Sequence, residues 1–201
     1  MIEPAFTRLL LASSNSGKLR EYTQLAGISG IEIEVLPNFP KLPAFDESAP
    51  TFAENAAGKA LHYSALAEGV VLADDSGLVV PALNGAPGVR SARYVGPEAT
   101  DADRIEKLLR EMKGKKGDAR RARFVCVTAI AARGRALAVV SDFVEGTIAE
   151  GPRGSNGFGY DPVFQMLDSN RTYAELQAEE KNCLSHRGRS FIKLVAILQC
   201  K

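Results

Sequence analysis

Two adjacent carboxylates, Asp74 and Asp75, lie between an apolar run and a glycine in the segment Leu72-Ala73-Asp74-Asp75-Ser76-Gly77-Leu78. Carboxylate oxygens, together with waters and phosphate oxygens, are the ligands that Mg²⁺ prefers. Residues 70–73 predict a short buried strand that ends at the acidic pair and presents it at the rim of a sheet. Because successive side chains of an extended segment point to opposite sides, the two carboxylates share one centre only if the chain turns there. We expect one carboxylate to bind the metal or a water and the other to fix the local backbone. The alternative is that the segment is a simple strand-ending turn.

A second candidate site lies near the start of the chain, where a strand, a small polar loop and a helix follow one another. Residues 8–12 predict a strand buried on both faces, and residues 19–26 carry apolar side chains at helical spacing. N–H groups at a helix start attract anions, and Lys18 would add a positive charge. The segment is not a P-loop, which needs a glycine at position 12 and a hydroxyl at 19. The loop is therefore a phosphate-binding segment or an ordinary capped helix start, and it comprises Ser13, Ser14, Asn15, Ser16, Gly17 and Lys18.

The next elements lead from this loop to the acidic pair. Residues 31–35 alternate strictly and predict a half-exposed strand near a sheet edge. The proline-rich segment 37–50, which carries Asp46 and Glu47, must be a loop. Thr51 with Glu54 predicts a capping box at the start of a helix that ends near Gly69. Asn55 and Lys59 lie four residues apart on this helix and could face a cleft. Polar residues at such positions are more often exposed to solvent, so we expect both to be solvated.

The middle of the chain combines a helix, a basic linker and a hairpin. Thr100 with Asp103 predicts a second capping box before an amphipathic helix. The linker 113–117 is followed by three arginines, and we expect a solvated turn rather than a nucleic-acid contact because aromatic residues are not interleaved with the charges. Residues 124–132 and 136–144 predict a hairpin at the centre of a second lobe, roughly residues 113–165.

The last third of the chain carries further candidates for ligand contact. A Gly/Pro-rich loop leads to Phe158-Gly159-Tyr160-Asp161, where an aromatic ring can stack on a base and a carboxylate can accept hydrogen bonds or reach a metal. Thr172 with Glu175 predicts the start of a helix that carries Lys181. His186, beside an arginine in a polar break, is a better candidate for a ligand contact than His62.

Composition limits the classes of protein to which the chain can belong. It has 201 residues, 45% of them apolar, which is enough for a sizeable core in a single domain, residues 1–201. The net charge of +1 favours neither nucleic acid nor an anionic membrane as a partner. Three separated cysteines fit a reducing compartment and are expected to be packing residues: Cys126, Cys183 and Cys200. The start of the chain lacks signal-peptide features, and no apolar stretch spans a bilayer, so we expect a soluble cytoplasmic protein.

Six motifs, in this order over nearly the whole chain, resemble the inosine triphosphate pyrophosphatase family, the Ham1-like pyrophosphatases of non-canonical purine nucleoside triphosphates. Any one motif is weak, but six in register are hard to obtain by chance. They are Ser-x-Asn-x-Gly-Lys at 13–18, Thr-Phe-x-Glu-Asn-Ala at 51–56, Ala-Asp-Asp-Ser-Gly-Leu at 73–78, Gly-Ala-Pro-Gly with Ser-Ala-Arg-Tyr at 85–94, Gly-Phe-Gly-Tyr-Asp-Pro at 157–162 and Leu-Ser-His-Arg-Gly at 184–188.

The resemblance implies a fold and an activity. The fold would be α/β, with a long mixed central sheet flanked by helices and two lobes around an active-site cleft, usually in a homodimer. The activity would be Mg²⁺-dependent hydrolysis of ITP, dITP and XTP to the monophosphate and pyrophosphate. By the same resemblance Asp75 would bind Mg²⁺, and it would either act as the general base for the attacking water or orient that base. The metal shell would be completed by Asp74, Asp46 and Glu47. The triphosphate would lie on residues 13–18, and the nucleotide would also meet Ser76, Phe158, Gly159, Tyr160, Asp161, Lys181, His186 and Arg187.

The same residues fit two other functions. One is a pyrophosphatase for other modified nucleotides, such as methylated pyrimidine triphosphates. The other is a nucleotide sensor or RNA-binding module that uses the lysine linker and the arginines at 120–123, which would bind without turnover and show strong salt dependence.

Overall fold

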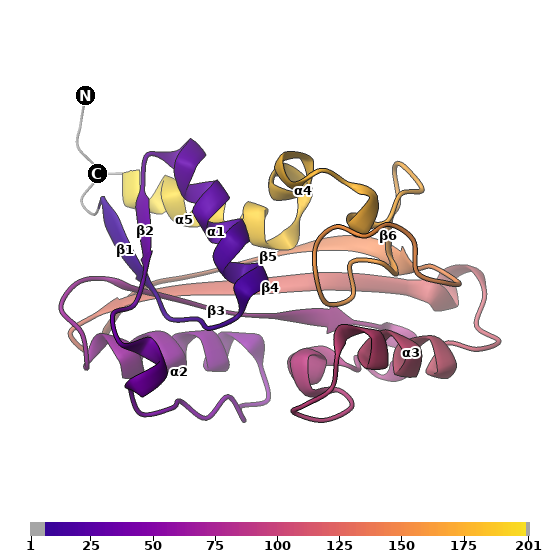
Figure 1. The fold of residues 1–201 in the computed structure, drawn as a ribbon, viewed down its shortest axis with the longest axis horizontal. Coiled ribbons are helices and arrows are strands. Elements are labelled where there is room, and N and C mark those ends of the chain that lie inside the picture. The colour runs from indigo at the N-terminus through magenta and orange to yellow at the C-terminus, as the bar shows by residue number, and fades with distance from the viewer. Residues whose placement is uncertain (1–6, 200–201) are drawn as a thin grey trace. The chain divides into compact units, whose positions relative to one another are not determined.

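A six-stranded mixed sheet in the order β2-β1-β3-β4-β5-β6 is the framework of the computed structural model, which describes residues 7–199 (Figure 1). Strand β1 pairs in parallel with β2 and β3, whereas β5 pairs antiparallel with β6. The mixed α/β class predicted above is confirmed. The strands are β1 (Arg8–Leu11), β2 (Glu32–Val35), β3 (Val71–Val79), β4 (Arg121–Ala132), β5 (Arg135–Ile148) and β6 (Phe164–Met166).

Helices fill the connections between the strands. Within the described residues none of them is both long and apolar enough to cross a membrane. Short 3₁₀-helices are also present, among them Tyr173–Glu175. The α-helices are α1 (Ser16–Ser29), α2 (Phe52–Ser64), α3 (Asp101–Glu111), α4 (Ala178–Leu184) and α5 (His186–Gln199).

The chain forms two compact units, and β3, β4 and β5 contribute residues to both. Unit 1 contains the chain up to Asp75, residues Cys126–Asp142 and the chain from His186 onward. Unit 2 contains Ser76–Val125 and Phe143–Ser185. Each unit has its own apolar core within the described residues.

In unit 1, successive residues of each buried strand pack on opposite faces of the sheet. Leu9, Leu11 and Leu72 belong to a cluster with side chains of α1 and α5, including Tyr22 and Phe191. The intervening residues belong to a second cluster with α2, and they include Leu10, Ala12, Val71 and Ala73. Burial on both faces explains why these strands are apolar without alternation.

Strand β3 continues through the acidic pair, so the prediction that it ends there is wrong. The strand runs from Val71 to Val79 without a turn, and residues 71–75 are all buried. The two-residue period of a strand therefore assigns the side chains of Asp74 and Asp75 to opposite faces. Asp74 lies on the face of Leu72, toward α1 and α5, and Asp75 lies on the face of Ala73, toward α2.

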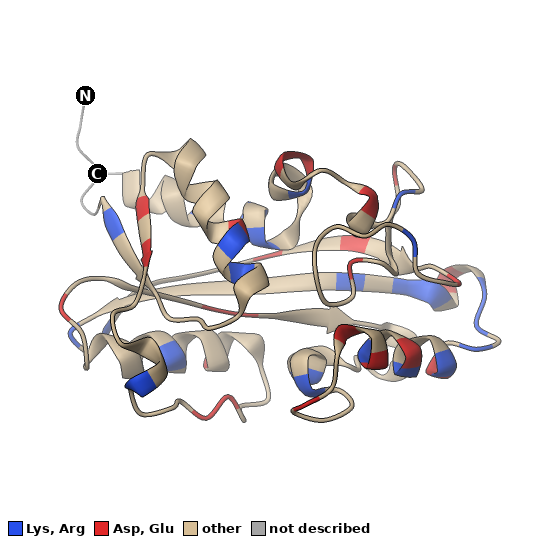
Figure 2. Ribbon diagram, in the orientation of Figure 1, with Lys and Arg blue, Asp and Glu red and all other residues tan. Residues whose placement is uncertain are grey.

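The core of unit 2 is built around three aromatic rings. Phe124 stacks on Tyr173 with 5.7 Å between ring centroids and 2° between planes, and Phe164 packs against both. Helix α3 presents Ile105 and Leu108 to this cluster and carries charges of both signs on its outer side (Figure 2).

Most predicted helix starts are confirmed, with differences in detail. Thr100 and Asp103 form the expected capping box of α3. Thr172 and Glu175 also form a capping box, but the element that follows is the short 3₁₀-helix at 173–175, and Lys181 lies on the separate helix α4. At Thr51 the Glu54 carboxylate accepts from the threonine hydroxyl at 2.6 Å instead of from its backbone N–H.

The sheet edge and the hairpin agree with the predictions, whereas the end of α2 and one cysteine differ from them. The edge position of β2 is confirmed, and so is the hairpin of β4 and β5, which are joined by a two-residue turn at Arg133 and Gly134. Helix α2 ends at Ser64, before the predicted Gly69, whose φ of +118° is not helical. Cys183 is exposed, so it is not the packing residue we expected, and Cys200 lies outside the described residues.

Thr51 provides a test of how α2 is held. Its hydroxyl accepts from the Glu54 N–H at 3.1 Å, and α2 supplies two residues to the site described below. Replacing Thr51 with alanine is expected to lower the free energy of unfolding by about 1 kcal/mol, because a helix N–H loses its acceptor. Urea unfolding measures this loss. Thr51→Ser keeps the hydroxyl and should unfold like the wild type; equal losses in both variants would contradict the capping role.

Candidate functional site

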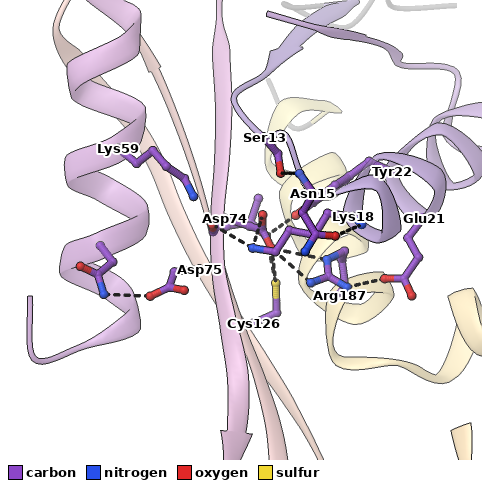
Figure 3. Close-up of polar contacts among 12 residues, drawn as sticks. Ser13, Asn15, Lys18, Glu21, Tyr22, Lys59, Asp74, Asp75, Cys126 and Arg187 are labelled. Carbon is purple, nitrogen blue, oxygen red and sulfur yellow. Dashed lines mark hydrogen bonds and ion pairs between the residues drawn. The ribbon is translucent and has the colours of Figure 1, made fainter. Parts of the chain in front are cut away.

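Asp74 is at the centre of a buried group of charges in unit 1 (Figure 3). Its carboxylate is 0% exposed. The Lys18 ammonium from α1 lies 2.9 Å from Asp74 Oδ1, and Arg187 Nη2 from α5 lies 3.3 Å from Asp74 Oδ2. Arg187 also donates through Nη1 to Glu21, one turn after Lys18 on α1. Two cations and two anions from α1, β3 and α5 thus neutralise each other.

The neighbouring cations keep the Asp74 carboxylate ionised. Burial by itself would raise the pKa of Asp74, but the positive charges of Lys18 and Arg187 outweigh it and hold the pKa below its ordinary value. Burial would likewise lower the pKa of Arg187, whereas Glu21 and Asp74 raise it well above its ordinary value. Because each buried charge is paired, loss of one member would leave another uncompensated.

A chain of small polar groups supports Asp74 on the same face of the sheet. Cys126 Sγ lies 3.8 Å from Asp74 Oδ2, and burial raises the pKa of the thiol to about 11, so the thiol keeps its proton and can donate. Thr128, two residues along β4, contacts the Tyr22 hydroxyl at 3.3 Å and accepts from Ser190 Oγ at 2.9 Å. Cys126 is therefore buried, as expected, but it also takes part in the polar network.

The polar loop predicted before α1 forms the first turn of the helix as well as its cap. Asn15 is the N-cap, and its Oδ1 accepts from the Lys18 N–H at 3.0 Å. Ser13 Oγ accepts from the Asn15 N–H at 3.2 Å. Ser14, Asn15 and Ser16 are exposed, and the first turn of α1 contains no acidic residue. An exposed helix start with a lysine beside it favours binding of an anion.

Asp75 lies on the opposite face of β3 and is met by α2. Asn55 Nδ2 donates to Asp75 Oδ2 at 2.9 Å, and Lys59 Nζ lies 2.6 Å from Glu47 Oε1. Figure 3 shows Lys59 and Asp75 on the same side of the strand. Asn55 and Lys59 are both buried, so the expectation that they are solvated is wrong.

The electrostatic environment of Asp75 differs from that of Asp74. Burial raises the pKa of the Asp75 carboxyl above its ordinary value, and the negative charge of Glu47 adds to the rise. Lys18 and the Asn55 hydrogen bond act in the opposite direction without cancelling it. A carboxylate with a raised pKa is a better proton acceptor at neutral pH than an ordinary aspartate.

The donor set near Asp75 fits a divalent cation that is shared with a ligand. Asp75 and Glu47 come from separate segments and are close enough for one charge to affect the other. Within residues 7–199 no three His, Cys, Asp or Glu side chains converge to hold a metal by themselves. Mg²⁺ commonly uses one or two carboxylates and takes its other ligands from water and phosphate. Asp46 is exposed, and it accepts from Ser48 Oγ at 2.7 Å.

A second group of predicted residues gathers in unit 2. Asp161 is 2% exposed; its Oδ2 accepts from the Phe158 N–H at 2.8 Å and forms a buried ion pair with Lys181 of α4. The Lys181 ammonium lies 5.0 Å from the centroid of the Phe158 ring, at cation–π distance. The Phe158 ring is partly exposed, whereas Tyr160 is buried. Of these residues, the partly exposed Phe158 ring is the one best placed to stack on a base.

Two glycines give this turn its shape. Gly157 has a φ of +75°, and a Cβ there would lie 2.0 Å from Asp161 Oδ2. Gly159 has a φ of +63°, and its N–H donates to Asp101 Oδ2 at 2.7 Å. Gly159 therefore contributes a backbone conformation rather than a free N–H donor.

The remaining predicted residues are placed as follows. His186 and Arg187 are buried at the start of α5, so the prediction of a polar break over residues 185–189 is wrong: only Ser185 separates α4 from α5. Arg187 directs its donors to Asp74 and Glu21. Ser76 follows Asp75 on β3 and belongs to unit 2.

The polar network also contains one residue that the sequence analysis did not name, Glu21, and three that it did not assign to the site, Asn55, Lys59 and Cys126. Glu21 lies three residues after Lys18, a spacing that places both on one side of α1 and that a sequence search could have used. Asn55 and Lys59 alternate with the buried Ala56 and Ala60, which was a sign that their side of α2 faces the sheet. Nothing in the sequence around Cys126 indicated that its thiol contacts Asp74.

The basic segment after α3 is engaged with the protein itself. Arg120 donates to the carbonyls of Ile148 at 2.5 Å and of Ala149 at 2.7 Å. Arg121 pairs with Asp118, and Arg123 with Glu145. These contacts favour a structural role for the arginines over the RNA-binding alternative.

Comparison with known proteins identifies the family. Residues 9–197 match the Ham1 family. A dITP/XTP pyrophosphatase of Geobacillus kaustophilus is 50% identical and aligns with 92% of this chain and 91% of its own length. A dITP/XTP pyrophosphatase of Bacillus licheniformis is 44% identical and aligns with 94% of this chain and 97% of its own length. The structure of a HAM1 protein from Coxiella burnetii has a TM-score of 0.84 and 43% identity, covering 96% of this chain and 98% of that chain. The resemblance based on the six motifs is confirmed, and the chain belongs to the Ham1 family.

Proposed function

We propose that this protein is a dITP/XTP pyrophosphatase that also accepts ITP and releases the nucleoside monophosphate and pyrophosphate. The relatives named dITP/XTP pyrophosphatase align with more than nine-tenths of the chain. The observation in the structure that carries the proposal is Asp75, a buried carboxylate with a raised pKa that has Glu47 beside it. Lys18 acts on the same carboxylate from the start of α1.

The triphosphate is proposed to bind at the start of α1. The segment from Ser13 to Lys18 offers exposed hydroxyl groups, helix N–H groups and an ammonium group. Negative charge that develops on the departing pyrophosphate would be stabilised by these donors. Asp74 holds the ammonium of Lys18 at 2.9 Å and so fixes where this positive charge lies.

Asp75 and Glu47 are the residues that would hold Mg²⁺. Asp74 is committed to Lys18 and Arg187, and Asp46 lies exposed in the loop, so both are proposed to act from outside the direct ligand set. Bound Mg²⁺ supplies positive charge that offsets the phosphate oxygens. Asp75, held by the Asn55 amide, would take the proton of the water that attacks the α-phosphorus.

The base is proposed to meet residues of both groups. Phe158 would stack on it, with Lys181 and Asp161 holding the turn and Gly159, Tyr160 and Ser76 shaping the surroundings. Hypoxanthine and xanthine carry an oxygen at position 6 where adenine carries an amino donor. Donors such as His186 and backbone N–H groups would donate to that oxygen and oppose the amino group. The family resemblance also assigns Arg187 to the nucleotide, and its guanidinium, which lies against Asp74 and Glu21, is proposed to act from behind these donors.

The family resemblance supports three further parts of the proposal. The chain would act as one domain of two lobes with the nucleotide in a cleft, it would form a homodimer, and it would work in the cytoplasm. A native molecular mass in solution tests the second of these.

Removing the charge of Asp75 should separate activity from folding. Asp75→Asn is expected to lower kcat by about 100-fold or more, since a general base contributes at least that much. Its free energy of unfolding should change by less than about 1 kcal/mol, because a neutral amide can still accept from Asn55. Pyrophosphate release and urea unfolding measure the two effects. Asp118→Asn, at a site 92% exposed, is the control; near-normal turnover by Asp75→Asn would refute the assignment.

Asp74 should behave differently from its neighbour. Asp74→Asn is expected to lose about 3–5 kcal/mol of stability, because Lys18 and Arg187 lose their buried partner. Since the pKa of Asp74 is lowered by folding, its contribution is present above the unfolded pKa of about 4 and fades as the pH falls below it. The stability gap between wild type and Asp74→Asn should therefore narrow on acidification. A gap that stays constant with pH would contradict the ion-pair role.

The products and the metal requirement test the activity itself. With Mg²⁺ the protein should convert dITP, ITP and XTP to monophosphate and pyrophosphate, and should hydrolyse ATP far more slowly because adenine presents a donor at position 6. Guanine carries an oxygen there, so slow hydrolysis of GTP is expected from the family resemblance alone. With a chelator in place of Mg²⁺ the rate should fall to background. Release of free phosphate, or equal rates on all five nucleotides, would overturn the proposal.

A further inference from the structure

The turn that carries Phe158 is attached to the start of helix α3. Gly159 N–H donates to Asp101 Oδ2 at 2.7 Å, although the two residues are 58 positions apart in the chain. Asp101 is the first residue of α3, and both residues belong to unit 2. This is a contact between the helix and the turn that is separate from the capping box of Thr100 and Asp103.

Gly159 has no side chain that could hold its backbone in place. Its φ of +63° is favourable for glycine, and a Cβ at this position would find nothing within 4 Å. No atom of the protein therefore packs against Gly159 on the side where that Cβ would lie. Glycine also loses more conformational freedom on ordering than any other residue. The hydrogen bond to Asp101 is the contact that fixes the peptide.

The neighbours of Gly159 are held by different groups. Phe158 N–H donates to Asp161 Oδ2 at 2.8 Å, and the Tyr160 hydroxyl donates to the Ser91 carbonyl at 2.9 Å. Asp101 supplies the middle anchor of the three. Its other oxygen lies 2.5 Å from Arg104 Nη2, and Arg104 donates in turn to the carbonyls of Ala92 and Ala99, so the carboxylate is itself held in place.

We infer that Asp101 is a positioning residue for nucleotide binding, which acts by fixing the Gly159 peptide and with it the Phe158 ring. This inference rests on the proposed function, in which Phe158 stacks on the base. Asp101 does not need to touch the nucleotide. Its loss would leave the chemistry at Asp75 intact and weaken binding of the base.

The experiment compares two acidic residues in the first turn of α3. Asp101→Ala should raise the KM for dITP by about tenfold, the effect of losing one charge-assisted hydrogen bond, with kcat changed by less than about threefold. Asp103→Ala removes a carboxylate from the same turn, with a similar effect on the helix dipole, but that carboxylate accepts from Thr100 and not from Gly159. Its KM should stay at the wild-type value.

Two further variants keep the test decisive. Asp101→Asn retains an acceptor and should restore most of the wild-type KM. Asp101→Ser suits a helix start but is too short to reach Gly159, so it replaces Asp101→Ala if that variant fails to fold. Equal KM changes in the Asp101 and Asp103 variants, or a wild-type KM in Asp101→Ser, would overturn the inference.

Amide hydrogen exchange of Gly159, measured by NMR without nucleotide, gives a readout that does not depend on activity. Exchange should be faster in Asp101→Ala and Asp101→Ser than in Asp103→Ala. If the wild-type protein did not hydrolyse dITP at all, the proposed function would fail. Unchanged exchange in the Asp101 variants would instead refute the anchor itself.

Discussion

The site in unit 1 depends on the uninterrupted extended backbone of β3 through Asp74 and Asp75. A strand sends successive side chains to opposite faces, so two chemically identical neighbours enter different environments. One meets the cations of α1 and α5, and the other meets the amide of Asn55 and the charge of Glu47. The pKa of one falls and that of the other rises. Separation of two carboxylates into different roles by their environments is a recurrent arrangement in enzymes.

The buried charges around Asp74 are costly to remove from water, and their mutual pairing offsets that cost. Such a group stabilises one arrangement of α1, β3 and α5 in unit 1, because a shift of any of them would separate a cation from its anion. The polar chain through Cys126 and Thr128 satisfies the remaining contacts on this face. The ammonium of Lys18 is thereby held at the exposed start of α1, in a position that the helix alone would not fix.

Much of the fold could be predicted from the sequence, because apolar runs, capping residues and turn residues act locally. The buried strands, the hairpin and the helix starts at Thr51 and Thr100 follow from such patterns. The course of β3 could not be predicted, since Asp, Ser and Gly usually end strands and only tertiary partners make a buried aspartate favourable. For the same reason Lys59 was expected to be solvated: its partner Glu47 lies in a loop whose position the sequence does not specify.

The amide of Asn55 joins two parts of unit 1 that carry like charges. Its Nδ2 donates to Asp75, while its Oδ1 accepts from the Ala49 N–H at 3.0 Å in the loop that contains Glu47. A neutral side chain therefore ties the loop that carries Glu47 to the strand that carries Asp75, and the Lys59 ammonium pairs with Glu47 at 2.6 Å. A cation at the proposed Asp75 and Glu47 site would therefore meet donors that hydrogen bonds and an ion pair already hold in place before it arrives.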